Sequence, residues 1–372
     1  MKTQKTEIIK EGNTEILVFK NKASKKGPGS KDEEPFYNPS MELNRDLSII
    51  VAQWLINSCK KDLHFLDGLA ASGVRGIRFA NELDDDFVVS INDWNDQAFL
   101  LIKRNIERSK LKNAVACNQN LNVLLSENKY DYIDIDPFGS PVYFIDSAVR
   151  SIYNNGIIAC TATDTAALCG VYPKVCARRY CAQPFHSYMM HELGLRILLG
   201  FICREAAKYD KGIEPILSYS TDHYFRVYVK IRRGKDYANK SIEKFSLINS
   251  KEIALSSNND ECQVGPLWLG NLHKKPALEE IRTLLFEKEL NTKNSLWKLL
   301  SLFEEEAEGP PFFFTTDDLA SYLKMAPPKM ETIFEKLQQK GYAVVRTHFS
   351  STGFKTDAPL DDIKEVFKEE NT

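Results

Sequence analysis

The stretch L-H-F-L-D-G-L-A-A-S-G-V-R-G-I-R-F-A-N-E-L (63–83) sets the fold class of this chain. Its apolar start and its Asp-Gly end predict a buried strand that leaves into a turn, and residues 73–83 have helical spacing. Gly68, Gly73 and Gly76 let this turn fold tightly and approach a ligand closely. The turn lacks the G-x-G-x-x-G pattern that seats a pyrophosphate. A purely structural turn would use the same glycines, so the turn alone is weak evidence for a ligand.

The alternation of strand and helix continues on both sides of this stretch, which predicts an α/β fold with a mostly parallel sheet. The last two strands are separated by only a few residues, so they must run antiparallel. A Rossmann-like parallel sheet that finishes in an antiparallel hairpin is the architecture of class I methyltransferases. The expected strands are 63–68, 87–93, 114–118, 130–137, 156–163, 214–220 and 224–231, and the expected helices are 41–58, 73–83, 98–108, 142–153 and 186–208.

The regions outside this pattern predict two further parts. Residues 1–40 read as an N-terminal arm and loop, 41–235 as the catalytic domain, and 236–372 as a smaller α+β domain. Within the last part, 235–275 look irregular and 277–306 helical. Residues 315–348 predict a helix capped by Thr316 or Asp317, a second helix and a strand, which is a winged-helix-like order. This order favours nucleic-acid contact, and a small packing domain is the alternative.

Composition indicates an ordinary globular protein. The chain has 372 residues, 43% of them hydrophobic and 27% charged, with a net charge of −2. No apolar run is long enough to span a bilayer, and the first residues lack a signal-peptide core. The eight cysteines form no C-x-x-C pair, so we expect free thiols, a cytoplasmic location and no bound metal. Cys169, Cys176 and Cys181 with His186 and His191 match no zinc spacing.

The ends of the expected strands carry the polar residues, and ligands of α/β sheets bind at that edge. A cofactor without phosphate, such as S-adenosylmethionine, needs close backbone and polar partners, for which Asp67, Gly68 and Gly73 are candidates. Asp93 ends the second strand 20 residues after Gly73, where an acid typically holds ribose hydroxyls. Its alternative role is a helix N-cap. The amides that follow the third strand are suited to the edge of an adenine.

The fourth strand ends in D-I-D-P-F-G-S-P (134–141), the most specific motif of the chain. Pro137 cannot continue the strand, so Phe138 should lie on an exposed loop. A carboxylate at Asp136 can accept the N–H of an aryl amine, localise its lone pair and take its proton. An aromatic face beside it can stack on an extruded base. This pattern predicts methylation of an exocyclic amine in nucleic acid.

The chain resembles the archaeal and eukaryotic tRNA (guanine-26, N2)-dimethyltransferases over nearly its whole length. The matching segments are F-Y-N-P-S-M-E-L-N-R-D-L (36–47), D-G-L-A-A-S-G-V-R-G-I-R (67–78), I-D-I-D-P-F-G-S-P (133–141), T-A-T-D-T-A-A-L-C-G (161–170), D-H-Y-F-R (222–226), G-P-L-W-L-G (265–270) and R-T-H-F-S-S-T-G-F-K-T-D-A-P (346–359).

The resemblance implies S-adenosyl-L-methionine as the cofactor. It also implies methylation of the N2 amine of guanosine 26 in tRNA, and the family's activity is dimethylation. It implies Asp136 as the catalytic carboxylate in the Asp136-Pro137-Phe138 motif, with Phe138 packed on the target guanine. The cofactor contacts that it implies are Arg45, Arg75, Asp93, Asn118 and Gln119.

Two features depart from the family pattern. Members usually have D-A-N where this chain has Asn118-Gln119-Asn120, so the contact of Asn118 with the adenine carries no charge. Some relatives hold zinc with cysteine pairs in the second domain, where this chain has only Cys262, so we expect no zinc.

The apparent wing near the C-terminus carries Arg346, His348 and Lys355, which we expect to contact tRNA. We expect no membrane association and no obligatory protein partner. A winged-helix regulator with a ligand-sensing α/β domain would leave the Asp136-Pro137-Phe138 motif unexplained. Another amine or another RNA position as the target stays open.

Overall fold

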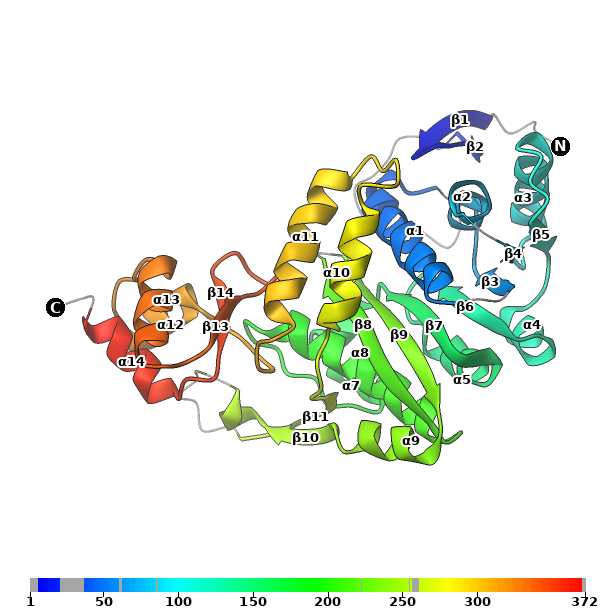
Figure 1. The fold of residues 1–372 in the computed structure, drawn as a ribbon. Helices are drawn as coiled ribbons and strands as arrows, with labels where there is room; N and C mark the ends of the chain where they lie inside the picture. The colour runs from blue at the N-terminus through cyan, green and yellow to red at the C-terminus, as the bar shows by residue number, and fades with distance from the viewer. Residues whose placement is uncertain are drawn as a thin grey trace.

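The computed structural model describes residues 6–20, 37–59, 62–84, 86–221, 223–253, 255 and 261–369. Most of the predicted 20–40 loop lies outside these residues. A seven-stranded sheet forms the centre, in the order β5-β4-β3-β6-β7-β9-β8 (Figure 1). Its strands are β3 (Leu63–Asp67), β4 (Phe87–Asn92), β5 (Ala114–Cys117), β6 (Tyr130–Ile135), β7 (Ile152–Ala162), β8 (Lys211–Ser220) and β9 (Phe225–Arg233).

The first five strands of this order run parallel. β9 runs antiparallel to both of its neighbours, β7 and β8, so β8 and β9 form the antiparallel hairpin that the sequence predicts. Alternate residues of β3 and β6 point to opposite faces, so Phe65 and Tyr132 pack on one face while Leu66 and Ile133 pack on the other. Two apolar layers therefore sandwich the sheet, and its strands are buried on both sides.

Helices cover both faces of the sheet. One face packs against α1 (Glu42–Asn57), α2 (Val74–Glu82) and α3 (Asp96–Arg108). The other packs against α4 (Leu121–Glu127), α5 (Val142–Ser151) and α8 (Met190–Ala207). Two short helices, α6 (Thr165–Leu168) and α7 (Pro173–Tyr180), lie between β7 and α8. Every predicted helix and strand of residues 41–235 is thus present, with ends shifted by a few residues.

Residues 6–19, which we placed in an N-terminal arm and loop, have regular secondary structure. They form the hairpin β1 (Thr6–Glu11) and β2 (Thr14–Phe19), which packs beside α2 and α3. Ile16 and Val18 are buried, and the backbone N–H of Leu17 donates to Oδ1 of Asn105 at 2.8 Å. The short apolar run I-L-V-F (16–19) is the sequence signal for this strand.

The expectation of irregular structure at 235–275 was also wrong. The segment forms α9 (Lys235–Ile242), β10 (Phe245–Asn249) and β11 (Gln263–Trp268). Two helices follow, α10 (Lys275–Leu284) and α11 (Lys293–Glu306), and they pack on α1 in one shared core. The predicted boundary at residue 235 therefore does not separate two cores.

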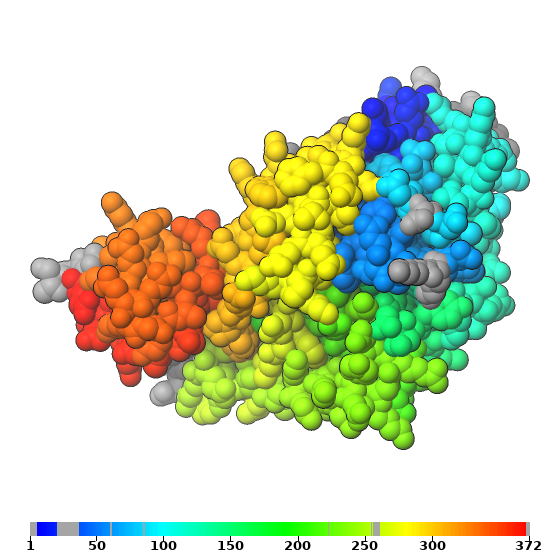
Figure 2. All heavy atoms as spheres, viewed as in Figure 1, coloured from blue at the N-terminus to red at the C-terminus, as the bar shows by residue number. Residues whose placement is uncertain are grey.

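The C-terminal lobe (residues 314–369) has its own small core and stands out from the rest of the molecule (Figure 2). It holds a three-stranded sheet, β12 (Phe314–Thr315), β14 (Gly353–Thr356) and β13 (Val344–Arg346), with α12 (Thr316–Leu323), α13 (Met330–Gln339) and α14 (Leu360–Glu369). The predicted order of helix, helix and strand is present, but the cap of α12 is Thr315, which accepts the N–H of Asp318. Among the described residues, no helix is long and apolar enough to cross a membrane.

Candidate active site

The turns after β3, β4 and β5 are joined by one buried amide, Asn92. Its Nδ2 donates to the carbonyl oxygens of Gly68 at 3.0 Å and Gln119 at 3.2 Å, and its Oδ1 accepts the N–H of Gln119 at 3.1 Å. Gly68 has no room for a side chain, because a Cβ would lie 2.9 Å from the carbonyl oxygen of Asp134. Gly73 has a φ of +78°, which favours glycine. The predicted cofactor turn is therefore a rigid cradle of backbone at the sheet edge.

Asp93 lies at the end of β4 and is held by this cradle. Its Oδ2 accepts the N–H of Ala71 at 2.8 Å, and its Oδ1 accepts the N–H of Asn95 at 2.9 Å. Burial raises the pKa of this carboxyl, and the two backbone donors act against that shift. The cap of α3 is Asn95, so Asp93 is not needed in that role. Asn118 fixes the neighbouring turn by donating to the carbonyl oxygen of Asp93 at 2.9 Å.

Two acids at the end of β6 form the centre of the site. Asp134 is fully buried and is paired with Arg226, whose Nη2 lies 2.5 Å from Oδ2 and whose Nη1 lies 3.1 Å from Oδ1. Nε of Arg75 lies 3.3 Å from Oδ1 of the same acid. Both oxygens of Asp134 are therefore occupied, and this acid serves to position the two guanidinium groups.

Asp136 differs because its side chain is 25% exposed. Its Oδ2 accepts from Nη2 of Arg75 at 2.6 Å. Burial alone would raise its pKa, but the charges of Arg75 and Arg226 and a hydrogen bond from Thr161 outweigh that effect and lower it. Asp136 is thus a carboxylate at neutral pH with part of its surface open to a substrate.

Arg75 is the residue that joins this acid to helix α1. Its Nη1 donates to Oδ1 of Asn44 at 2.9 Å and to Oγ of Ser48 at 2.5 Å. We predicted Arg75 as a cofactor contact, and the structure places it against Asp136, the residue that we predicted as the catalytic carboxylate. Its five donors are arranged as a fixed fork, which is suited to holding a carboxylate in one orientation.

Phe138 lies two residues beyond Asp136, on the loop that follows β6. The strand ends at Ile135, and Pro137 follows after Asp136. The Phe138 side chain is 46% exposed, so part of its ring is accessible to a partner. A partly exposed carboxylate and a partly exposed aromatic ring therefore lie at the same edge of the sheet.

A family model described as N2,N2-dimethylguanosine tRNA methyltransferase matches residues 12–368. The chain belongs to this family.

Relatives of this family align over almost the whole chain. A tRNA (guanine(26)-N(2))-dimethyltransferase of Methanobrevibacter smithii is 37% identical over 358 residues, which cover 91% of this chain and 92% of that protein. The protein of the same description from Thermococcus kodakarensis is 38% identical over 383 residues, with 97% and 98% covered. A solved structure of Trm1 from Pyrococcus horikoshii with S-adenosyl-L-methionine matches with a TM-score of 0.85 at 35% identity, covering 96% of this chain and 99% of that one.

Arg45, which we predicted as a cofactor contact, lies on α1 and is engaged by the N-terminal hairpin. Its Nε donates to Oε2 of Glu11 at 2.8 Å, and its Nη2 donates to the carbonyl oxygen of Asn38 at 2.9 Å. Tyr37 donates to the same glutamate at 2.7 Å. In this conformation Arg45 ties the hairpin to α1 and does not reach the cradle through any of these bonds.

The expectation that His348 and Lys355 contact tRNA does not fit their positions. Their side chains are 1% and 2% exposed, between the C-terminal lobe and the rest of the molecule. Nδ1 of His348 lies 2.5 Å from Oε2 of Glu306, and Nζ of Lys355 lies 2.8 Å from Oε1 of Glu192 and 3.0 Å from Oε1 of Glu306. Burying the Lys355 ammonium without an acid would be costly. Both side chains therefore find their partners inside the protein. Arg346 remains accessible, with 41% of its side chain exposed.

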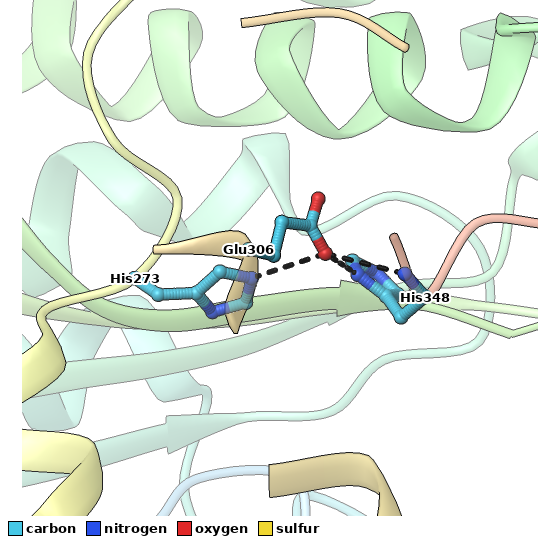
Figure 3. Close-up of side chains that lie close together, drawn as sticks. All are labelled: His273, Glu306 and His348. Atoms are coloured by element: carbon cyan, nitrogen blue, oxygen red, sulfur yellow. Dashed lines mark hydrogen bonds and ion pairs between the residues drawn. The ribbon is translucent and has the colours of Figure 1, made fainter. Parts of the chain in front are cut away.

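The same contact raises the question of a metal, because His273, Glu306 and His348 place ligand atoms within 4.8 Å of one another (Figure 3). Nε2 of His348 accepts the backbone N–H of Ser220 at 3.3 Å, so in the neutral ring its proton lies on Nδ1 and points at Glu306. The ammonium of Lys355 adds positive charge at the same carboxylate. These partners suit a hydrogen-bonded contact between lobes better than a cation site.

Sequence reasoning missed two residues that shape the site. Arg226 is fully buried in β9 and neutralises Asp134, and Asn92 joins three turns. The signal for Arg226 was present, because a charged residue inside the apolar run Y-F-R-V-Y-V needs a buried partner. Asn92 stood next to Asp93, but nothing in the sequence showed which of the two side chains points inward.

Proposed function

We propose that this chain transfers methyl groups from S-adenosyl-L-methionine to the exocyclic N2 amine of guanosine 26 in tRNA, and that it adds two of them. The observation that carries the proposal is that a partly exposed carboxylate, Asp136, and a partly exposed ring, Phe138, lie at the strand-end edge that also carries Asp93. Membership of the dimethylguanosine family and the named activity of its relatives support the substrate.

The residues of the cradle fit S-adenosyl-L-methionine, which supplies the methyl group when bound. Asp93 keeps lone pairs free after accepting two backbone N–H groups, so it can accept hydroxyl groups of a ribose. Asp67, Gly68 and Gly73 would line the amino-acid end, and Asn118 and Gln119 would face the adenine. The missing side chain at Gly68 lets backbone and ligand come close.

Asp136 orients the amine and receives its proton. The lone pair of an aryl amine is delocalised into the ring, so an acceptor for its N–H favours the geometry in which that pair is available. The lowered pKa makes Asp136 a weak base toward the neutral amine. Once the nitrogen gains positive charge, its proton becomes acidic and the carboxylate can take it. The gain is therefore greatest in the transition state, as catalysis requires.

Phe138 holds the target base outside its helix. Flipping a nucleotide out of its helix costs a few kcal/mol, because the base loses its stacking partners. Stacking on an aromatic side chain offsets about 1–3 kcal/mol of this cost. The 46% exposure of Phe138 leaves ring surface for this purpose. The tRNA body would extend toward the C-terminal lobe, where Arg346 offers an accessible cation to a phosphate.

The deciding experiment is mass spectrometry of nucleosides from unmodified tRNA incubated with the protein and labelled cofactor. We expect labelled N2,N2-dimethylguanosine, located at position 26 by sequencing of nuclease fragments. A guanosine-to-adenosine change at position 26 should abolish labelling. Label on another base, or at another position in that control tRNA, would reject the assigned target while leaving a methyltransferase.

Asp93 tests the cofactor half of the proposal separately. Asp93→Ala should weaken binding of S-adenosyl-L-methionine by about 2–4 kcal/mol, the scale of two hydrogen bonds to a charged acceptor. Calorimetry without tRNA measures this directly. Asp96→Ala, in the first turn of α3, is the nearby control and should leave affinity unchanged. Equal affinities for wild type and Asp93→Ala would remove Asp93 from the cofactor site.

A further inference from the structure

The loop of residues 136–141, here the catalytic loop, is held by side chains to which the proposed reaction gives no role. Its backbone is fixed first by Thr163, at the end of β7. The N–H of Gly139 donates to Oγ1 of Thr163 at 2.7 Å, and the N–H of Thr163 donates to the carbonyl oxygen of Gly139 at 2.9 Å. Thr163 thus binds both backbone polar groups of Gly139, the residue that follows Phe138.

A second anchor holds the loop at Ser140, which is buried. Oγ of Ser140 lies 2.9 Å from the hydroxyl of Tyr180, and that hydroxyl donates to Oδ1 of Asp164 at 2.7 Å. Nη1 of Arg179 binds the other oxygen of Asp164 at 3.0 Å. A chain of hydrogen bonds therefore runs from the catalytic loop to helix α7, and its acid is charge-balanced.

Tyr180 lies in the middle of this chain of hydrogen bonds, and its surroundings hold its hydroxyl in place. Its side chain is 2% exposed, and its ring packs edge-on against Phe201 with centroids 5.8 Å apart. Burial and the neighbouring Asp164 raise the pKa of Tyr180 well above its usual value, so the phenol keeps its proton and stays a donor. Buried polar side chains of this kind require partners, and these partners all belong to the loop or to its support.

The position of the anchors matters because of what the loop carries. Asp136 and Phe138 differ in chemistry but must meet one base at once, and both lie on a segment with no regular structure. A loop in this position tolerates little displacement, since an error of about 1 Å in a reacting geometry can cost about 100-fold in rate. Contacts at Gly139 and Ser140 limit such displacement without touching the substrate.

We propose that Thr163, Asp164 and Tyr180 are positioning residues, which clamp residues 139 and 140 and thereby aim Asp136 and Phe138 at the same base. The proposal rests on the function proposed above for Asp136 and Phe138. None of the three clamp residues contacts reacting atoms in it. They act through the loop, so their loss should slow methyl transfer while binding of cofactor and tRNA persists.

The main test is Tyr180→Phe, which deletes both hydrogen bonds of the hydroxyl and keeps the ring against Phe201. We expect the single-turnover rate at saturating protein to fall about 10- to 100-fold, with the dissociation constants for tRNA and cofactor within about two-fold of wild type. Tyr188→Phe is the matched control, because its hydroxyl reaches the carbonyl oxygen of Ile253 at 3.5 Å, away from the loop. It should keep the native rate.

Thr163 gives an independent test with a conservative rescue. Thr163→Val keeps the shape and removes the acceptor for Gly139, so it should show the same split between rate and affinity. Thr163→Ser keeps the hydroxyl and should restore most of the rate. A merely structural role would lower thermal stability in both variants without this difference in rate.

Hydrogen exchange separates a failed clamp from a failed assignment of function, because it needs no activity. In Thr163→Val and Tyr180→Phe, amides of a peptide covering 136–141 should exchange faster than in wild type, and those of β3 should not. If exchange is unchanged, or if the rate of Tyr180→Phe stays within two-fold of wild type, the clamp is overturned. If exchange rises but wild type methylates a different nucleoside, the target assignment fails and the clamp stands.

Discussion

Two buried charge clusters in this molecule use similar side chains for different ends. The sheet-edge cluster comprises Arg75, Arg226, Asp134 and Asp136, and the interlobe cluster comprises Glu192, Glu306, His348 and Lys355. In the interlobe cluster every side chain is at most 2% exposed, whereas Asp136 in the sheet-edge cluster is 25% exposed. Both clusters hold their acids with cations, since an unpaired buried charge would be prohibitively costly.

Under the function proposed above, an accessible acceptor, rather than buried charge, distinguishes the reactive cluster. Arg75 and Arg226 saturate Asp134 but leave part of Asp136 open beside Phe138. Glu306 has no such opening, because Thr347, His348 and Lys355 surround its oxygens. Substitutions in the first cluster should therefore act on turnover, and those in the second on stability.

The largest effect should come from Asp136→Asn. The amide keeps the size but loses the charge and the basicity, so we expect single-turnover methylation to fall about 100- to 10,000-fold. Affinities for tRNA and cofactor should stay nearly unchanged, because the loss concerns the transition state. Phe138→Ala should slow turnover less and weaken engagement of the flipped base. An Asp136→Asn enzyme with a near-native rate and a lowered melting temperature would make Asp136 a structural residue and end the contrast between the clusters.

The interlobe cluster should give the opposite result. Glu306→Ala leaves Lys355 and His348 short of a partner, and breaking a buried ion pair costs about 3–5 kcal/mol of unfolding free energy. Urea denaturation measures this loss, and single-turnover rates well below the transition should remain native. Glu305→Ala, one residue earlier and exposed, is the control that should change neither. Loss of turnover without loss of stability would assign the interlobe cluster a role in catalysis.

A pH dependence sharpens the contrast within the sheet edge. Burial and the charge of Asp134 raise the pKa of Asp67 to about 7, against about 3.9 in an unfolded chain. The folded state then binds this proton more tightly, so ionisation of Asp67 lowers the unfolding free energy as pH rises from about 4 to about 7, by at most ~1.4 kcal/mol per pH unit. Below that window both states are protonated, and above it the penalty is constant.

Asp67→Asn removes this titration. The stability of Asp67→Asn relative to wild type should therefore rise between pH 5 and pH 7 and level off above pH 7. Urea denaturation of both proteins across this range, without cofactor, measures the difference. A difference that is independent of pH would mean that Asp67 is already ionised in the folded protein at pH 5.

The sequence predicted the parallel sheet and its edge because both depend on short-range patterns. Apolar runs ending in Asp67, Asp93 and Asp136 define strands and their carboxyl ends, and parallel strands bring those ends together. The roles of individual residues were harder, because partners come from distant segments. Arg75 meets Asp136 across 61 residues, and Arg226 meets Asp134 across 92.

The misjudged segments share a physical cause as well. Lys355 and His348 stand in a polar stretch that resembles a solvated wing, and only the docking of the lobe against Glu192 and Glu306 buries them. The hairpin of β1 and β2 is stabilised by its packing against α2 and α3. The local sequence of the hairpin is therefore only a weak indication of its strands. In each case the structure depends on burial against segments that are distant in the chain, and a single sequence does not show which distant segments meet.

The smallest expected effect concerns Arg346, which separates surface from interior within the C-terminal lobe. The Arg346 side chain is 41% exposed, and its Nη2 lies 3.5 Å from Oε1 of Glu331. An exposed ion pair of this kind is weak, so a phosphate can replace the glutamate. Arg346→Gln should weaken tRNA binding a few-fold at moderate salt and reduce the slope of log affinity against log salt by about 0.9, one phosphate contact. Arg108→Gln is the control. Arg108 lies on α3, at the other end of the molecule (Figure 1), and its side chain is 38% exposed and paired with Glu15 of β2. Cofactor affinity and the single-turnover rate at saturating tRNA should stay native in both. A salt slope equal to that of wild type would mean that Arg346 contacts no phosphate of the tRNA.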